Sequence, residues 1–276
     1  GQILHDTEVA TIAASDDRLD FIIGSVHQIV GEKDFYYIDY EKMSMDEIYD
    51  LLERYFKEIY ELGADAVLIS DLGAFNICRK AAPDLEIHIS TQANNTNYMT
   101  VQSWHEMGAK RVVLAREMTL SEVREIRDNI SRECELEIFM HGAMCVSYSG
   151  RCLLSNYMTA RDSNYGACSH PCRWNYSLME ETRPGEYMPV YENERGTYIF
   201  NSKDLCLIDY LDKIEEAGIY SLKIEGRMKE PAYVANVVSK YRAALDKTAT
   251  EEDKENLKKT FNRTYTKGYL FGEDPK

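Results

Sequence analysis

The sequence predicts an α/β fold in which parallel strands alternate with helices, as a (β/α) TIM-like barrel or a partial barrel. From residue 63 onward, short apolar runs rich in β-formers alternate with amphipathic stretches of helical period. Helices of roughly ten or more residues between strands imply parallel pairing through right-handed crossovers. With 276 residues, the chain can bury a full core as one barrel or as two small domains.

Residues 1–62 are expected to contribute a strand and a helix that complete or flank the barrel. The run LDFIIGSVH (19–27) is apolar and ends in polar residues, which is typical of a buried strand. The stretch MSMDEIYDLLERYFKEIYEL (43–62) has the helical period, with Ser44 as its N-cap and Glu47 in position to close a capping box.

Residues 63–246 carry the regular alternation, and residues 247–276 are expected to form a C-terminal helix and tail. Thr119 is placed to cap one helix with Glu122 in the capping-box position, and Pro231 opens another helix at its first turn. The expected strands are 65–70, 85–92, 111–117, 136–142 and 219–226, and the expected helices are 73–84, 96–108, 119–130, 203–218 and 231–246.

A cysteine-rich loop, residues 142–176, interrupts this alternation and holds Cys145, Cys152, Cys168 and Cys172. Six, fifteen and three residues separate successive cysteines. The apolar run before the loop places the first cysteine just past the C-terminal end of a strand, which is the functional edge of parallel α/β folds.

Three kinds of chemistry would gather four thiols in this way: disulfides, a zinc site or an iron–sulfur cluster. No signal peptide and no membrane span is recognisable, so we expect a cytoplasmic protein whose thiols stay reduced. Zinc sites usually carry two short cysteine pairs, and only one spacing here is short, which favours the cluster over zinc. Four inert buried thiols are the remaining interpretation.

Cys206 is a further candidate ligand. It follows the sequence NSKD and would fall on the first turn of the helix expected at 203–218, where the helix dipole stabilises a thiolate. It could replace Cys168 or Cys172, but the short spacing of those two cysteines brings them together without any folding, so the compact set is preferred.

The cysteine-rich loop and its surroundings match a known signature at several positions. Further motifs that match are GACSHPCRW (166–174), NSKDLC (201–206), SLKIEGRMKEPAYV (221–234) and FNRTYTKGYLFGE (261–273). The signature positions are Glu137, Phe139, Gly142, Ala143, Met144, Cys145, Gly150, Cys152, Leu154 and Ser155. These residues resemble peptidase family U-32, the collagenase-like peptidases, over about residues 63–276, and they are closest to the branch that includes the tRNA hydroxylation proteins.

The resemblance implies a [4Fe–4S] cluster on Cys145, Cys152, Cys168 and Cys172. For that branch it also implies formation of 5-hydroxyuridine at the wobble position of tRNA, with prephenate as a co-substrate. The family's name keeps proteolysis of a peptide as the alternative, although the HExxH signature of common zinc proteases is absent and metal-bound thiols are not free nucleophiles. A cluster-binding scaffold fragment without turnover is the third possibility.

Residues 1–62 instead resemble the PHP phosphoesterases of the histidinol-phosphatase type, through GQILHD (1–6) and the run at 20–40. That resemblance would make His27 a metal ligand. The HxH pair, the upstream Glu and the late DxH pair of those enzymes are missing, so a structural strand-end histidine is the favoured interpretation. The two resemblances would meet near Tyr60 to Ala64.

Active residues of such barrels lie at the C-terminal ends of the strands. Cationic side chains gathered there would suit an anionic, carboxylate-bearing small molecule, because Arg binds carboxylates through two parallel hydrogen bonds. A histidine there would relay a proton or hydrogen-bond a cluster sulfur. The structural alternatives are solvated ion pairs at the rim, Arg116 with Glu117 and Lys223 with Glu225, and a structural histidine at the strand end. The candidates are Arg116, Glu117, His141, Lys223, Glu225 and Arg227, together with Ser70, Asp71 and Ser90 to Gln92 from earlier strands.

The formal net charge of −15 argues against a general nucleic-acid-binding protein, because phosphate contacts need a surplus of Lys and Arg. A local basic patch would still suffice for contact with a tRNA. The 20 tyrosines are scattered along the chain, a distribution more typical of half-buried surface than of platforms for stacking bases.

Overall fold

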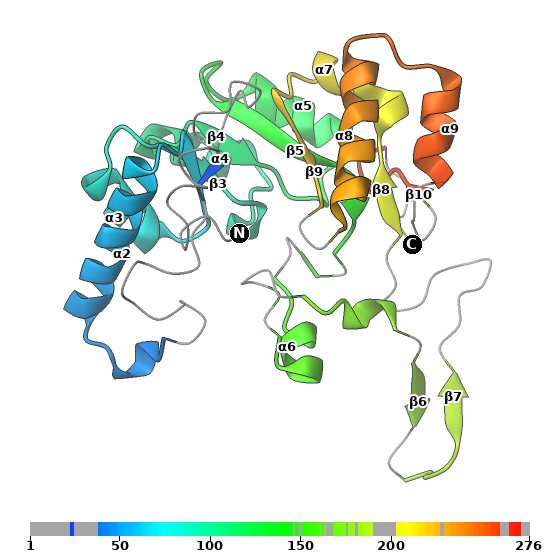
Figure 1. Cartoon of the computed structure of the whole chain (residues 1–276), viewed down its shortest axis with the longest axis horizontal. Coiled ribbons are helices and arrows are strands. Elements are labelled where there is room, and N and C mark those ends of the chain that lie inside the picture. Colours follow the sequence, from blue (N-terminus) through cyan, green and yellow to red (C-terminus); the bar gives the residue numbers. More distant parts are fainter. Residues whose placement is uncertain are drawn as a thin grey trace. The chain divides into compact units, whose positions relative to one another are not determined.

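The computed structural model describes residues 23–24, 38–145, 147–148, 151–161, 163, 168–174, 176–179, 182–189, 203–226, 229–259 and 265–271. His27, Arg227 and most of the strand expected at 19–27 lie outside the described residues. The chain divides into two compact units. Unit 1 comprises residues 1–95, 99–113 and 131–134, and unit 2 comprises residues 96–98, 114–130 and 135–276 (Figure 1).

Unit 1 is a parallel α/β layer. Its strands pair in chain order, β1 (Ile23–Gly24) with β2 (Ala66–Ile69), β2 with β3 (Glu86–Ile89), and β3 with β4 (Arg111–Val113). The helices between them are α2 (Met45–Glu61), α3 (Leu72–Ala81) and α4 (Tyr98–Met107), and α2 packs beside α3. Short 3-10 turns lie at Tyr40–Lys42 (η3) and Thr91–Ala93 (η4).

Helix α2 begins with the capping box that the sequence predicts. Ser44 Oγ accepts the backbone N–H of Glu47 at 3.3 Å, and the Glu47 carboxylate accepts the backbone N–H of Ser44 at 2.7 Å. This capping box satisfies two N–H groups that the first turn would otherwise leave without partners. Leu51, Phe56 and Ile59 then bury one face of the helix, as its apolar period predicts.

Unit 2 is built on β5 (Glu135–Ala143), the longest described strand. On one side β5 pairs in parallel with β9 (Ser221–Ile224), and on the other side it pairs antiparallel with β8 (Asp204–Cys206). β8 in turn pairs in parallel with β10 (Tyr265–Thr266). The helices are α5 (Leu120–Asp128), α6 (Leu154–Thr159), α7 (Leu211–Glu216), α8 (Pro231–Leu245) and α9 (Glu251–Lys259).

Between β5 and β8, the described residues form α6, a 3-10 turn at Pro171–Arg173 (η6), and a hairpin of β6 (Ser177–Met179) with β7 (Tyr187–Pro189). The hairpin is a sheet of its own (Figure 1). The predicted α/β class, a mostly parallel sheet alternating with helices, is confirmed. The closed TIM-like barrel and the cysteine-rich insertion remain predictions. Among the described residues, no helix combines the length and the apolar character that a membrane crossing requires.

One predicted helix is wrong at its start. Residues 203–218 were expected to be helical throughout, but they begin with strand β8, continue through a 3-10 turn at Ile208–Tyr210 (η7), and become α-helical only in α7. Asp204 and Leu205 are buried, and the ladder pairs Cys206 with His141 of β5. Pairing with β5 thus overrides a short apolar run that periodicity alone cannot assign. Cys206 is therefore not on the first turn of a helix, and the dipole argument for it is wrong.

Candidate functional site

The C-terminal half of β5 organises the candidate site in unit 2. Glu225 follows β9, and its backbone N–H donates to the carbonyl oxygen of His141 at 2.9 Å. This approach depends on Gly142, which has φ +104°, and where a Cβ would lie 2.7 Å from the carbonyl oxygen of Glu225. Glycine alone fits both that backbone conformation and that contact. The sequence thereby brings the ends of β5 and β9 together.

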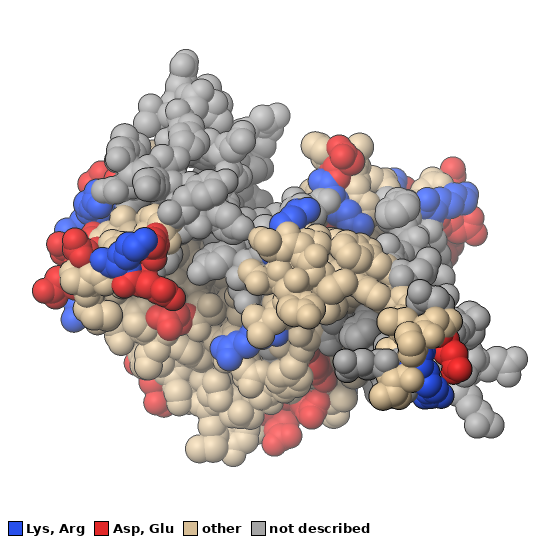
Figure 2. Space-filling model, turned by 90° about the horizontal axis from the view of Figure 1, so that it is seen from below, with Lys and Arg blue, Asp and Glu red and all other residues tan. Residues whose placement is uncertain are grey.

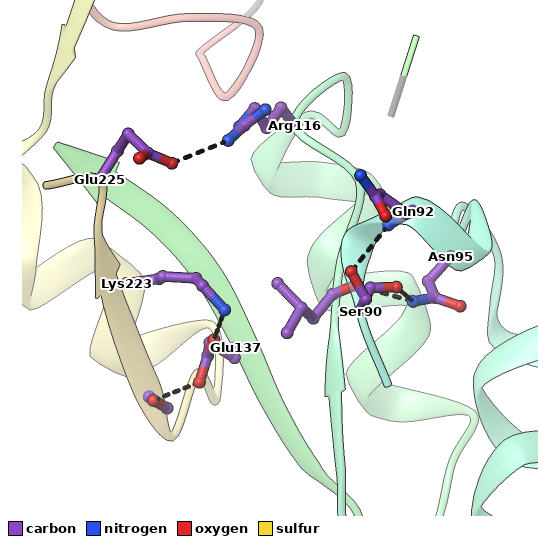
Figure 3. Close-up of polar contacts among 9 residues, drawn as sticks. Ser90, Gln92, Asn95, Arg116, Glu137, Lys223 and Glu225 are labelled. Atoms are coloured by element: carbon purple, nitrogen blue, oxygen red, sulfur yellow. Dashed lines mark hydrogen bonds and ion pairs between the residues drawn. The ribbon is translucent and has the colours of Figure 1, made fainter. Parts of the chain in front are cut away.

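Charged side chains from three segments meet around the ring of Phe139. The Arg116 guanidinium lies over the ring, with Cζ 3.8 Å from its centroid, and the Lys223 ammonium lies 5.5 Å from the same centroid. Arg116 Nη2 is 3.6 Å from the Glu225 carboxylate (Figure 3). Lys223 Nζ donates at 3.1 Å to Glu137, which is 4% exposed (Figure 3).

These ion pairs differ from the pairs that neighbours in sequence suggested. Arg116 pairs with Glu225 rather than with Glu117, and Lys223 pairs with Glu137 rather than with Glu225. Both ion pairs therefore join segments that lie far apart in the sequence. Burial lowers the pKa of Arg116, and the charges of Cys145, Glu225 and Glu117 oppose that shift.

Three of the four cysteine sulfurs accept a backbone N–H from the residue two positions later: Cys145 from Ser147, Cys152 from Leu154 at 3.3 Å, and Cys168 from His170 at 3.3 Å. Such bonds favour the thiolate, because they stabilise negative charge on sulfur.

The Cys145 thiol and the Arg116 guanidinium beside Phe139 shift each other's pKa. Burial raises the pKa of Cys145, the Ser147 N–H and the Arg116 guanidinium lower it, and nearby Cys152 and Cys168 raise it. Cys172 is buried. In the described part of the chain, no three His, Cys, Asp or Glu side chains are gathered closely enough to hold a metal ion. The N–H donors give three of the sulfurs the surroundings of thiolate ligands, but the four cysteines, all among the described residues, are not gathered into one ligand set in this structure.

His141 is enclosed by aromatic rings. It is 1% exposed, and its ring contacts those of Tyr233, Tyr241 and Tyr265 at centroid distances of 6.2, 5.5 and 5.4 Å. Burial lowers the pKa of His141 to about 4, with Lys229 adding to this shift and Asp204 opposing it. The imidazole is therefore neutral at pH 7. Its Nε2 has no hydrogen-bond partner among the described residues.

Sequence reasoning missed the surroundings of His141. The hydroxyl of Tyr241 donates to the carbonyl oxygen of Met140 at 2.9 Å, accepts the N–H of Leu207 at 3.2 Å, and lies 3.4 Å from His141 Nδ1. Burial raises the pKa of Tyr241 well above its ordinary value, and the neighbouring Cys206 raises it further. The only sequence signal was the place of Tyr241 on the apolar face of its helix, and it did not point to a histidine.

A small cavity adjoins Arg116. Its lining includes Met118, Phe139, Leu205 and Lys267, so its walls are mostly apolar with two cations at the edge. The space inside is about 20 Å³, which is enough for one water molecule or little more. A small organic anion would need these side chains to move.

The strand ends of unit 1 are engaged in turns. Ser90 Oγ accepts the N–H of Gln92 at 3.2 Å (Figure 3). Asn95 Nδ2 donates to the carbonyl oxygens of Ser90 and Val113 at 2.9 and 2.8 Å. Asp71 caps α3 by accepting the N–H of Ala74 at 2.9 Å. These contacts give a structural explanation for the polar residues at these strand ends.

Known proteins resemble this chain over most of its length. A tRNA hydroxylation protein P of Escherichia coli K12 is 39% identical over 78% of this chain and 57% of its own length. A tRNA hydroxylation protein P1 of Bacillus subtilis 168 is 41% identical over 87% of this chain and 60% of its own length. The 23S rRNA 5-hydroxycytidine C2501 synthase of E. coli K12 is 34% identical over 70% of this chain and 28% of its own length. The chain thus spans less than two thirds of each of these relatives.

A family model described as peptidase family U32 matches residues 27–276. More than half of the segment that resembled a phosphatase lies inside this match, so that second resemblance has no support and the family reaches further than residue 63. A short apolar run ending in a polar turn is common to many α/β strands, and it was too little to carry a second family. With the match extending over nearly all of its residues, this chain belongs to peptidase family U32.

Proposed function

We propose that this chain hydroxylates a uridine of tRNA to 5-hydroxyuridine, with prephenate as co-substrate and a [4Fe–4S] cluster held by Cys145, Cys152, Cys168 and Cys172. The names of all three relatives concern hydroxylated RNA, two for tRNA and one for 23S rRNA. RNA hydroxylation is therefore the activity that this family membership favours.

The observation that carries the proposal is the environment of the cysteine sulfurs. Cys78 shows what an inert buried thiol looks like here: burial alone acts on it and raises its pKa to about 12. Cys145, Cys152 and Cys168 each receive a backbone N–H, and Cys145 also faces Arg116. Donors aimed at sulfur are what thiolate ligands of a cluster require. Bound to these thiolates, the cluster would supply one-electron redox chemistry.

Arg116 supports the anionic co-substrate. A guanidinium carries five N–H donors, and the contact of Arg116 with Glu225, at 3.6 Å, is longer than a hydrogen bond. Its Nε has no hydrogen-bond partner among the described residues. Arg116 thus retains donors for a carboxylate of prephenate beside Cys145, while Lys223 is already engaged by the buried Glu137. Binding would displace side chains around the small cavity.

The test is an assay of the protein reconstituted anaerobically with iron and sulfide. Unmodified tRNA and prephenate are added, and nucleosides are analysed by mass spectrometry. The unmodified protein and Cys78→Ser should form 5-hydroxyuridine, whereas Cys145→Ser should lose both bound iron and product. Failure to form 5-hydroxyuridine when iron and sulfide are fully bound would rule out the hydroxylase and leave the scaffold.

Proteolysis is the alternative, and it rests on the family's name. Incubation with gelatin tests it directly, since cleavage that persists in Cys145→Ser would favour a peptidase over the hydroxylase. No contact in the described part of the chain argues for it.

A further inference from the structure

The short helix α6 turns polar side chains inward and large apolar side chains outward, the reverse of an ordinary surface helix. Its inward residues are polar: Ser155 is fully buried, and its Oγ accepts the N–H of Ser169 at 3.0 Å. One turn later, Thr159 Oγ1 lies 2.8 Å from Ser169 Oγ. Two large apolar side chains point outward beside the exposed Asn156: Leu153, the N-cap residue, is 74% exposed and Tyr157 is 84% exposed. A helix normally buries its apolar side, so this one presents a surface for something outside it.

These two side chains are the most exposed large apolar residues in the described chain. Hydroxyl groups hold the helix in this orientation, because the bonds between Ser155, Thr159 and Ser169 would be lost if it turned over. Exposure of Tyr157 is therefore a consequence of how α6 is fixed.

A second aromatic group lies close by in the fold. Helix α6 contacts η6, and Trp174 immediately follows η6 with 44% exposure. The Trp174 ring stacks near that of Tyr176, with centroids 6.5 Å apart and planes 29° apart. The Tyr176 hydroxyl donates to the carbonyl oxygen of Pro171 at 2.7 Å, which fixes the ring. Trp174 is thus held with part of its surface open.

The charge of this segment differs from that of the whole chain. Residues 145–179 contain three arginines and one aspartate, with no lysine or glutamate, in a chain of net charge −15. Arg151 and Arg161 are exposed. Figure 2 shows Lys and Arg beside Asp and Glu in several places on the face it presents. The exposed aromatic residues therefore occur where the local charge favours a polyanion.

We propose that Tyr157 and Trp174 form a platform on which unpaired bases of an RNA stack, with Arg151 and Arg161 contacting its phosphates. Proteins that bind single-stranded RNA combine these two features, aromatic rings for the bases and arginines for the backbone. The platform lies in the cysteine-rich loop, so a bound nucleotide would be held in the same segment as the proposed cluster ligands. This inference rests on the proposed function and adds the RNA contact surface to it.

RNA fits this surface better than a protein partner does. An apolar protein interface is depleted of charge at its centre and needs a continuous apolar patch. Here arginines alternate along the chain with aromatic residues, a pattern that suits a strand of alternating bases and phosphates.

The experiment measures fluorescence anisotropy of a labelled RNA hairpin with an unpaired, uridine-containing loop, titrated with the iron-reconstituted protein. Tyr157→Ala and Trp174→Ala should each weaken binding by roughly 5- to 150-fold, the range expected for loss of one base–aromatic stack. Tyr157→Phe should retain binding, because the ring is kept. Tyr220→Ala is the matched control, since Tyr220 is also exposed, at 68%, but lies outside residues 145–179. A fully paired duplex should bind the unmodified protein more weakly than the hairpin.

Iron content of each variant verifies that the cysteine-rich loop still folds. Equal affinity of Tyr157→Ala, Trp174→Ala and the unmodified protein for the hairpin would overturn the platform while leaving the hydroxylase proposal intact. The platform would also be overturned if Tyr157→Ala abolished self-association and left hairpin binding unchanged. The hydroxylase proposal is judged separately by 5-hydroxyuridine formation, so the two can fail independently.

Discussion

Replacing Gly142 by alanine tests whether β9 must approach β5 closely for the site to form. A non-glycine residue at φ +104° costs about 1–2 kcal/mol in backbone strain. The new Cβ would also lie 2.7 Å from the carbonyl oxygen of Glu225 and 2.8 Å from its Cβ. Relieving these contacts means moving the end of β9, and overpacking of this kind costs about 1–3 kcal/mol. Gly142→Ala should therefore lower the free energy of unfolding by about 2–5 kcal/mol.

Gly185 offers a matched control. It has φ +90°, and a Cβ there would meet no atom of the described residues within 4 Å. Gly185→Ala should therefore carry the backbone strain alone, at most about 1–2 kcal/mol. Urea unfolding followed by circular dichroism measures both variants. Hydrogen exchange of the Glu225 amide, which donates to His141, should accelerate in Gly142→Ala and stay unchanged in Gly185→Ala.

Equal losses of stability in the two variants would refute the reasoning, because the steric contact would then contribute nothing. Unchanged exchange of the Glu225 amide in Gly142→Ala would refute it as well, since β9 would not have moved.

Three further variants probe the same unit. Glu137→Gln should lower the free energy of unfolding by about 2 kcal/mol, more than Ser221→Ala, because it deprives Lys223 of a buried carboxylate; equal losses in urea would contradict this. His141 has a folded pKa of about 4 against an ordinary 6.5. Between these values the unfolded chain binds a proton that the buried imidazole does not, so the free energy of unfolding decreases as the pH falls below 6.5. Between pH 7 and 5 the unmodified protein should lose about 2 kcal/mol more than His141→Gln, as urea titrations at both pH values would show. Cys206→Ser should keep its iron, because the proposed ligands are the four cysteines of the cysteine-rich loop; iron loss would make Cys206 a ligand.

Helix starts were predictable because the interactions that define them are local. Ser44 with Glu47 and Thr119 with Glu122 each form the predicted capping box. All the atoms involved lie within four consecutive residues, so sequence spacing determines their geometry.

Strand β8 was not predictable in the same way. The residues from Asp204 to Cys206 carry no pattern that separates a strand from a helix, and their conformation follows from β5, more than 60 residues earlier. Separation in the sequence also explains why the ion pairs of the site were not predictable. Pairing Arg116 with Glu225 requires knowing that β9 lies beside β5 and in which register, which neither residue reveals locally.

The tyrosines of this chain differ in their exposure, and the exposed Tyr157 of the cysteine-rich loop departs from the expected pattern. Tyrosines scattered along a chain suggested half-buried surface, but Tyr233 and Tyr241, whose rings contact that of His141, are buried. Tyr157 is the opposite case, because Ser155 occupies the buried side of α6 and turns the tyrosine outward. Leaving apolar surface in water is unfavourable, so a sequence that fixes it there with buried hydroxyl groups has exchanged stability for a binding surface. The local surplus of arginine around it indicates that the bound molecule is an anion.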